Sequence, residues 1–246
     1  MLEAAFWGAV GASSLLIGAL IGLLVRLPSV VIGLVLGFGA GTLISAVSFE
    51  LTEEAYAQGG ADAVVIGLAL GALAYYLGDY VVEKHGAMQR MSSVDSKAVS
   101  ASASTALLLG AVLDGIPESV VIGASLINED SASIAVVVAV FLSNVPEAVA
   151  ASSDLLREGW SRRRVFLMWV IVVAASTIAA GIGYAALKDA SGAWISSIQA
   201  FSAGAILTML ADEMIPEAFE YTDHNKTVGV ALAFGFAVSA ALSFRT

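Results

Sequence analysis

Long apolar runs, separated by short polar segments, dominate the pattern of this chain. Each run is close to the roughly 20 residues that an α-helix needs to cross the hydrocarbon core of a bilayer. The runs do not alternate as barrel strands do, and a helix satisfies its own backbone hydrogen bonds in lipid. The pattern predicts an all-α polytopic membrane protein whose eight transmembrane helices cover residues 4–25, 30–51, 63–82, 101–127, 132–154, 165–187, 193–219 and 227–244.

The composition agrees with a membrane protein and narrows the chemistry. Hydrophobic residues make up 59% of the 246 positions and charged residues only 13%, whereas about a quarter is charged in a soluble domain. Cysteine is absent, so disulfides and thiolate metal sites are excluded and a metal needs O or N donors. The net charge of −10 argues against nucleic acid as a partner.

Lysine and arginine fall mostly on one side of the predicted membrane. Nine of the 11 basic residues lie in the segments after the first, third, fifth and seventh apolar runs. Because basic loops stay inside, we expect a multi-pass protein of the plasma (inner) membrane with both termini outside. Arg162–Arg164 form the densest basic cluster and are expected to contact anionic lipid headgroups. Asp154, one turn before this basic region, is expected to pair with Arg157 or a neighbouring basic residue.

Two segments far apart in the chain resemble each other. Phe38–Tyr56 aligns without a gap with Phe201–Phe219 at an offset of 163, and six of the nineteen positions are identical. The aligned pairs include Glu50 with Glu213 and Glu54 with Glu217. The copies lie on the second and seventh predicted helices, which cross the membrane in opposite directions. The pattern predicts an inverted repeat, which is typical of alternating-access transporters.

Acidic residues interrupt the fourth and fifth apolar runs at two Pro-Glu pairs. Asp114 and Glu118 share one helical face, and Pro146 precedes Glu147 on the next run. An unpaired carboxylate is costly at membrane depth, so such acids usually serve a function. Each proline also leaves the carbonyl four residues earlier without its helical donor. The two helices together are expected to enclose an oxygen-rich cation site.

These motifs resemble those of the ZIP family of divalent-metal transporters, bacterial members included. The fourth helix of that family commonly reads H-N-x-P-E-G, and here residues 114–119 read DGIPES. The fifth helix carries a similar motif, and here residues 143–148 read SNVPEA. This chain diverges at the helix-4 histidine, which is Asp114, and at the following asparagine, which is Gly115. Residues 212–217, DEMIPE, also resemble the end of the family's seventh helix.

The resemblance implies one ZIP-like transmembrane domain over residues 1–246, arranged as 3+2+3 helices. It implies import of a divalent metal ion, such as zinc, iron, manganese or cadmium, towards the cytosol without ATP or an organic cofactor. Helices one, four, five and six would form a unit that slides, as in an elevator, against the others. The expected metal ligands are Asp114, Glu118, Ser143, Asn144 and Glu147. The expected pathway residues are Glu50, Glu54, His85, Asp212, Glu213 and Glu217.

The sequence leaves several alternatives open. Ser143 and Asn144 fit equally as metal ligands and as hydrogen-bonding residues that pack helices. The same intramembrane acids would also suit a secondary transporter of another cation or a proton-conducting protein. An intramembrane enzyme is disfavoured, because no H-E-x-x-H motif occurs and Asp114 stands alone at the centre. A homodimer is compatible with the sequence.

Overall fold

All secondary structure in the described residues is helical. The computed structural model describes residues 1–92, 115, 117–123, 126 and 133–244. The elements are α1 (Leu2–Leu24), α2 (Ser29–Ala46), the π-helix η1 (Val47–Thr52), α3 (Glu53–Ser92), α5 (Ile134–Arg157), α6 (Arg162–Leu187), α7 (Gly192–Met209), the π-helix η2 (Leu210–Met214), α8 (Ile215–Tyr221) and α9 (Thr227–Ser243). Residues 117–123 are helical as well.

Several of these helices are suited to a bilayer. Five helical stretches of the described residues are long and apolar enough to cross it: Leu2–Leu24, Ser29–Val82, Ile134–Arg157, Arg162–Leu187 and Gly192–Tyr221. The apolar helix Thr227–Ser243 is shorter. The predicted class, a helical multi-pass membrane protein, is confirmed. Most of the predicted fourth span, 101–127, lies outside the described residues.

The third helix is much longer than the predicted span 63–82. It runs from Glu53 to Ser92 and contains a kink at Gly60, whose φ of 72° and ψ of −176° are not helical. Glycine tolerates this positive φ because it has no Cβ. The hydrophobic pattern located the membrane-spanning part, but the acids at 53 and 54 and the polar stretch 83–92, predicted to be a linker, continue the helix. Charged side chains end an apolar run without ending a helix, since they can remain in water.

Two π-helical segments occupy matching places in the two similar segments of the chain. η1 begins at Val47 and η2 begins at Leu210, which is the same offset of 163 that aligns the sequences. Each carries one of the aligned glutamates, Glu50 and Glu213. A π-helical turn inserts an extra residue into the helix, and such turns are frequent at functional sites. The helix axis continues through both segments, so the predicted spans 30–51 and 193–219 are each built from consecutive elements.

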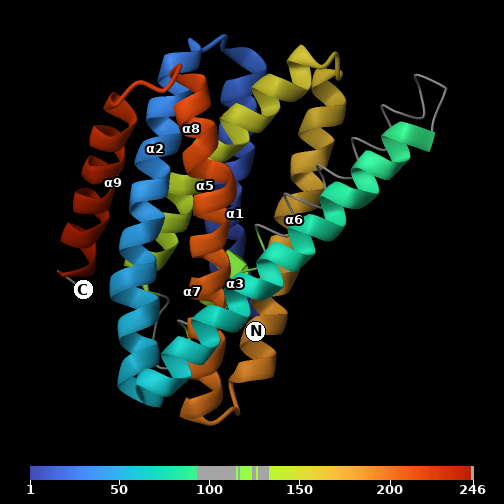
Figure 1. Ribbon diagram of the computed structural model, residues 1–246. Coiled ribbons are helices and arrows are strands. Elements are labelled where there is room, and N and C mark those ends of the chain that lie inside the picture. Colours follow the sequence, from blue (N-terminus) through green and yellow to red (C-terminus); the bar gives the residue numbers. More distant parts are fainter. Residues whose placement is uncertain (93–114, 116, 124–125, 127–132, 245–246) are drawn as a thin grey trace.

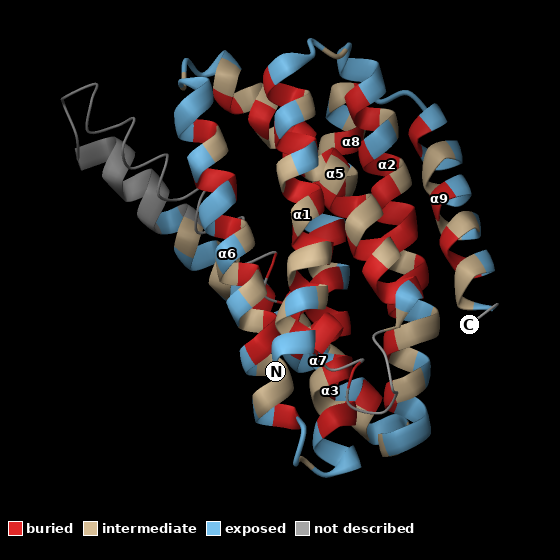
Figure 2. Ribbon diagram, turned by 180° about the vertical axis from the view of Figure 1, so that it is seen from behind, coloured by how far each residue is buried: buried red, intermediate tan, exposed pale blue. Residues whose placement is uncertain are grey.

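The helices pack in two groups that meet between α2 and α5. In the first group α1 packs against both α5 and α6, and in the second α2 packs against α9 and α8 while α3 packs against α7. Figure 1 shows α9 at one edge of the bundle and α3 running diagonally across the other helices. Buried residues concentrate where α1, α2 and α5 face one another, and the outer faces of α6 and α9 are largely exposed (Figure 2).

Glycines allow α2 and α9 to approach closely. A Cβ on Gly41 of α2 would collide with the carbonyl oxygen of Leu232, and a Cβ on Gly235 of α9 would collide with that of Phe38. The two contacts are reciprocal, since each helix presents a glycine to the backbone of the other. Van der Waals packing of small residues is a main source of helix association in membranes.

The α3–α7 pair repeats this arrangement. A Cβ on Gly204 of α7 would meet the carbonyl oxygen of Leu68, and a Cβ on Gly71 of α3 would meet that of Phe201. Gly204 and Phe201 lie 163 positions after the corresponding glycine and phenylalanine of α2. Both helix pairs therefore use equivalent residues of the two similar segments.

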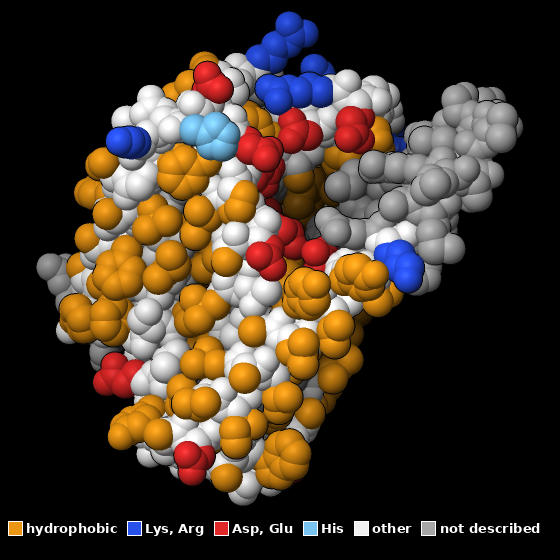
Figure 3. Space-filling view, viewed as in Figure 1, with side chains coloured by type: hydrophobic (Ala, Val, Ile, Leu, Met, Phe, Trp, Pro, Cys, Tyr) orange, Lys and Arg blue, Asp and Glu red, His pale blue; other side chains and the backbone are white. Residues whose placement is uncertain are grey.

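Both ends of the chain lie on one side of the bundle. In Figure 1 α1 begins and α9 ends at the lower ends of these helices, the side on which α2 turns into α3 and α6 connects to α7. Most of the visible lysine and arginine side chains gather at the opposite, upper end (Figure 3).

Candidate metal site

The fifth helix supplies most of the described candidate ligands. Its first turn is capped by Ser133, whose hydroxyl accepts a hydrogen bond of 3.4 Å from the Val136 amide. Pro146 lies inside the helix, which continues to Arg157. Because proline has no N–H, the carbonyl of Leu142 lacks its usual helical donor at this level. The proline therefore offers an additional oxygen beside Glu147.

Two neighbouring positions of α5, Ser143 and Asn144, have different surroundings. Ser143 is fully buried, and its hydroxyl donates a hydrogen bond of 2.9 Å to the Val140 carbonyl of the same helix. Its backbone lies against Gly39 of α2. Asn144 is also buried, and its side-chain oxygen has no hydrogen-bond partner among the described residues. An orphaned amide oxygen of this kind is an acceptor for a cation or a water molecule.

Glu118 and Glu147 come from different helices and lie within electrostatic range of each other. Glu118 follows Pro117 in the helical segment 117–123 and is 4% exposed. Glu147 is partly buried on α5, and its carboxylate interacts electrostatically with that of Glu118. Two carboxylates so placed repel each other when both are charged, and a cation between them would remove that repulsion. The structure therefore brings together the two glutamates of the Pro-Glu pairs.

Two glutamates of the repeated segment join this pair. Glu213 of η2 and Glu217 of α8 both interact electrostatically with Glu147. They are four residues apart, so they share one helical face. Glu213 accepts a hydrogen bond of 2.6 Å from the hydroxyl of Tyr75 on α3, which fixes one of its oxygens. Glu213 and Glu217, predicted as pathway residues on the seventh span, thus lie within electrostatic range of Glu147.

The remaining predicted pathway residues have other surroundings. Asp212 is exposed. Glu50 accepts a hydrogen bond of 2.8 Å from Ser133, at the N-terminal end of α5. Glu54 accepts one of 3.0 Å from Gln58. Glu50 therefore lies at the end of α5 opposite to Asp154, and Glu54 follows it by four residues in the chain.

Two predicted residues cannot be placed. Asp114 lies outside the described residues, and of His85 only its position in α3 is described. Within the described ranges, no three Asp, Glu or His side chains are grouped closely enough to hold a metal ion together. The candidate ligands among the described residues are Glu118, Glu147 and the Asn144 oxygen, and Asp114 stays a prediction.

The acids continue from the central pair towards the basic end of the bundle. Glu217 interacts electrostatically with Asp154 of α5 and with Glu220 of α8, in addition to Glu213. Figure 3 shows acidic side chains around a hollow on this face, below the cluster of lysine and arginine. Such a surface raises the local concentration of cations. The structure thus connects the central glutamates to one end of the bundle through acidic residues.

Sequence reasoning did not identify the tyrosines that hold these acids. Tyr75 bonds Glu213, and Tyr221 donates a hydrogen bond of 2.6 Å to Asp154. The sequence predicted the pairing of Asp154 with Arg157, which is present at 3.0 Å. Tyr221 follows Glu217 by four residues, so its position on the acidic face of α8 was readable from the spacing. The spacing could not predict its partner Asp154 on α5, which lies 67 residues away in the chain.

The comparisons with known proteins assign the family. The family model described as ZIP zinc transporter matches residues 79–243, about two thirds of the chain. The search of curated proteins found no match. The chain belongs to the ZIP zinc transporter family, as its Pro-Glu motifs predicted.

Membership in this family indicates the general function of the protein. ZIP proteins transport divalent metal ions across membranes and are not enzymes, and the metal is their substrate. The multi-pass helical fold and the paired intramembrane acids agree with that function. This protein is therefore a membrane transporter of divalent metal ions.

Proposed function

We propose that this protein moves divalent metal ions across the plasma membrane towards the cytosol by alternating access, with the ion bound between Glu118 and Glu147. The observation that carries the proposal is the interaction of these two glutamates across two helices. An ion between them would be held by charge, and each carboxylate offers two oxygens. Asn144 adds a neutral oxygen that lacks another partner among the described residues.

The complete ligand set proposed is Asp114, Glu118, Ser143, Asn144 and Glu147. All of these donate oxygen, which suits manganese, ferrous iron and zinc with less discrimination than imidazole or thiolate would give. The proposed substrates are zinc, iron, manganese and cadmium. The acids Glu213 and Glu217 would pass the ion on towards the basic end of the bundle, and Asp212, Glu50, Glu54 and His85 are the remaining proposed pathway residues.

The proposed movement is a slide of one helix group against the other. The first group contains α1, α5 and α6, and its coherence is supported by the buried hydrogen bond of 2.8 Å from Trp169 to Ser152. The second group is held by the reciprocal glycine contacts of α2 with α9 and of α3 with α7. Between the groups, Gly39 of α2 lies against Ser143 and Pro146 of α5. Small residues carry no long side chains that would obstruct the sliding of one helix along another.

An inverted repeat of helices one to three with six to eight underlies the proposed 3+2+3 arrangement of eight spans. Its support is the matched position of η1 and η2 and the equivalent glycines of the two helix pairs. With nine of the 11 basic residues on one side, both termini would lie outside. Homodimer formation is a further proposal that an oligomeric-state measurement in detergent would test.

Neutral replacement of the central glutamates tests the proposal. In reconstituted vesicles, Glu118→Gln and Glu147→Gln should each abolish zinc uptake, because glutamine keeps the shape but loses the charge that binds the ion. Glu158→Gln is the matched control, since Glu158 caps the same helix and is exposed. Full uptake by the double variant would contradict the site.

Metal-dependent stability separates the proposal from transport of other cations or protons. A ligand present at about 100 times its dissociation constant stabilises the folded protein by about 2.7 kcal/mol. Zinc or manganese should therefore raise the melting temperature of the purified protein, and Glu147→Gln should lose most of that rise. A rise with protons or organic cations alone would favour the other transport functions.

A further inference from the structure

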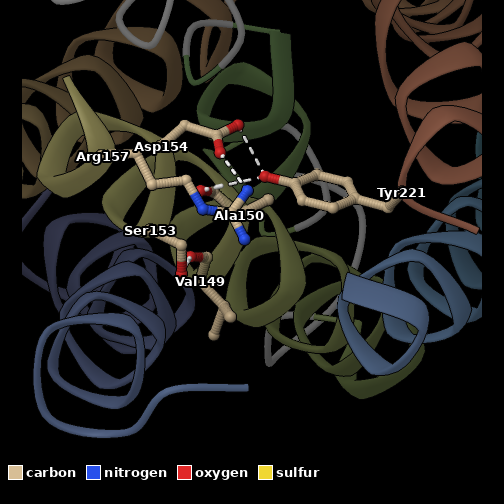
Figure 4. Close-up of polar contacts among 6 residues, drawn as sticks. All are labelled: Val149, Ala150, Ser153, Asp154, Arg157 and Tyr221. Carbon is tan, nitrogen blue, oxygen red and sulfur yellow. Dashed lines mark hydrogen bonds and ion pairs between the residues drawn. The ribbon is translucent and has the colours of Figure 1, made fainter. Parts of the chain in front are cut away.

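A tyrosine on α8 joins the two helix groups at the basic end of the bundle. Tyr221 is the last residue of α8, and its hydroxyl donates a hydrogen bond of 2.6 Å to the Oδ2 atom of Asp154 on α5. The same hydroxyl lies 3.4 Å from the carbonyl oxygen of Ala150. Figure 4 shows the phenol ring reaching across to these two acceptors. The contact therefore connects α5 of one group to α8 of the other.

The second oxygen of Asp154 is bound within α5. Its Oδ1 atom lies 3.0 Å from Nη1 of Arg157, one turn further along the helix. The guanidinium also lies 6.0 Å from the centre of the Tyr221 ring. Arg157 and Asp154 have side chains 58% and 47% exposed, so their ion pair is screened by water and contributes little by itself. The hydrogen bond from Tyr221 goes to the other carboxylate oxygen, Oδ2, and does not require this ion pair.

The two acceptors of Tyr221 fix the position of α5 along its own axis. Ala150 and Asp154 are four residues apart, which is about 6 Å along a helix. A displacement of α5 along α8 by one turn, about 5.4 Å, would carry both acceptors away from the hydroxyl. The bond also lies next to the acidic residues, because Glu217 is one turn before Tyr221 and interacts with Asp154. The contact can exist in one axial position of α5 and not in another.

We propose that Tyr221 and Asp154 form a lock that holds α5 in its present position against α8, and that the lock must open each time the first helix group slides. The inference rests on the sliding movement proposed above and adds the contact that controls it. Tyr221 would be a positioning residue, acting on transport through Asp154 and not by binding the ion.

The natural absence of cysteine allows a direct test. Ala150→Cys places one thiol on the α5 face beside the lock, where the residue is 1% exposed. Its rate of labelling by a small water-soluble methanethiosulfonate in metal-free liposomes would measure how often α5 leaves this position. Ser196→Cys is the matched control, because Ser196 is fully buried and bonds the Ala55 carbonyl inside the α3–α7 pair. If Ala150→Cys does not fold, Val149→Cys at the adjacent buried position of α5 replaces it.

Removal of the hydroxyl should unlock the helix. In the Ala150→Cys protein, Tyr221→Phe and Asp154→Ala should each speed labelling about tenfold, the expected effect of losing a hydrogen bond to a charged group. Arg157→Gln should change the rate less than about twofold, as for an exposed ion pair. The thiol of Ser196→Cys should be labelled at an unchanged rate in all of these backgrounds.

Two results would overturn the lock. Unchanged labelling at position 150 in both Tyr221→Phe and Asp154→Ala would mean that the bond does not restrain α5. Equal acceleration at positions 150 and 196 would mean that the bond supports the whole fold and not one helix position. Because labelling needs no metal, it remains informative if zinc uptake by the unmodified protein fails, and that failure would overturn the proposed function alone.

Discussion

The indole N–H of Trp169 donates a hydrogen bond of 2.8 Å to the hydroxyl of Ser152, and both residues are almost completely buried between α6 and α5. Ser152→Ala would leave the indole N–H without its acceptor in an apolar interior. We expect this to lower the free energy of unfolding by about 1–3 kcal/mol. The melting temperature in detergent would measure it.

Ser153→Ala is the control for that change. Ser153 is only partly buried, and its hydroxyl bonds the Val149 carbonyl of its own helix at 2.7 Å (Figure 4). Its loss should cost less than about 0.5 kcal/mol. Equal melting temperatures of the two variants would show that the Trp169 contact does not stabilise the α5–α6 packing.

Gly235 and Gly229, both on α9, should respond in opposite ways to alanine. A methyl group at Gly235 would collide with the Phe38 backbone, whereas one at Gly229 would meet no atom within 4 Å. Overpacking should make Gly235→Ala less stable by about 1–3 kcal/mol. Gly229→Ala should gain up to about 1 kcal/mol, because alanine is the better helix former. Melting temperatures of both variants decide this, and a tolerated Gly235→Ala would mean that α9 packs more loosely against α2.

The acids near the basic end should assist transport without being indispensable. Glu217→Gln should reduce zinc uptake at low ionic strength by about tenfold, because acidic clefts concentrate cations. The loss should shrink at high salt, where the field is screened within about 10 Å or less. Initial uptake rates at two salt concentrations test this, with the exposed Glu158→Gln as the matched control. A salt-independent and complete loss would instead assign Glu217 to the binding site.

Selectivity should depend on position 114, where the family's histidine is replaced. Asp114→His would return an imidazole to an all-oxygen ligand set, and imidazole favours zinc over manganese. We expect the zinc-to-manganese uptake ratio to rise about tenfold, equivalent to about 1.4 kcal/mol. Competition uptake with both ions gives the ratio directly. A flat ratio in a variant that still transports would remove Asp114 from the ligand set.

The sequence by itself determined the class and the family, and it drew attention to the acids of the two Pro-Glu pairs. Apolar runs long enough to span a bilayer leave the backbone no alternative to helices, so membrane helices followed from length alone. The Pro-Glu pairs could be recognised as candidate functional residues because carboxylates are rare and costly at membrane depth. The pairing of Asp154 with Arg157 could be predicted for a different reason. Residues three apart on one helix are neighbours whatever the rest of the fold does.

The tertiary structure decided which helices contact each other and how far each one is shifted along its axis relative to its neighbours. The hydrophobic pattern predicted neither the start of α3 at Glu53 nor its kink at Gly60. Charged residues end a hydrophobic run, but they do not end a helix. The hydrogen bonds of Tyr75 with Glu213 and of Tyr221 with Asp154 join residues 138 and 67 positions apart. The membrane-spanning helices among the described residues are apolar over most of their length, so hydrophobicity does not specify their rotation or axial position. Those are set by close contacts between backbones at glycines and by single polar bonds, which exist only once the helices have packed.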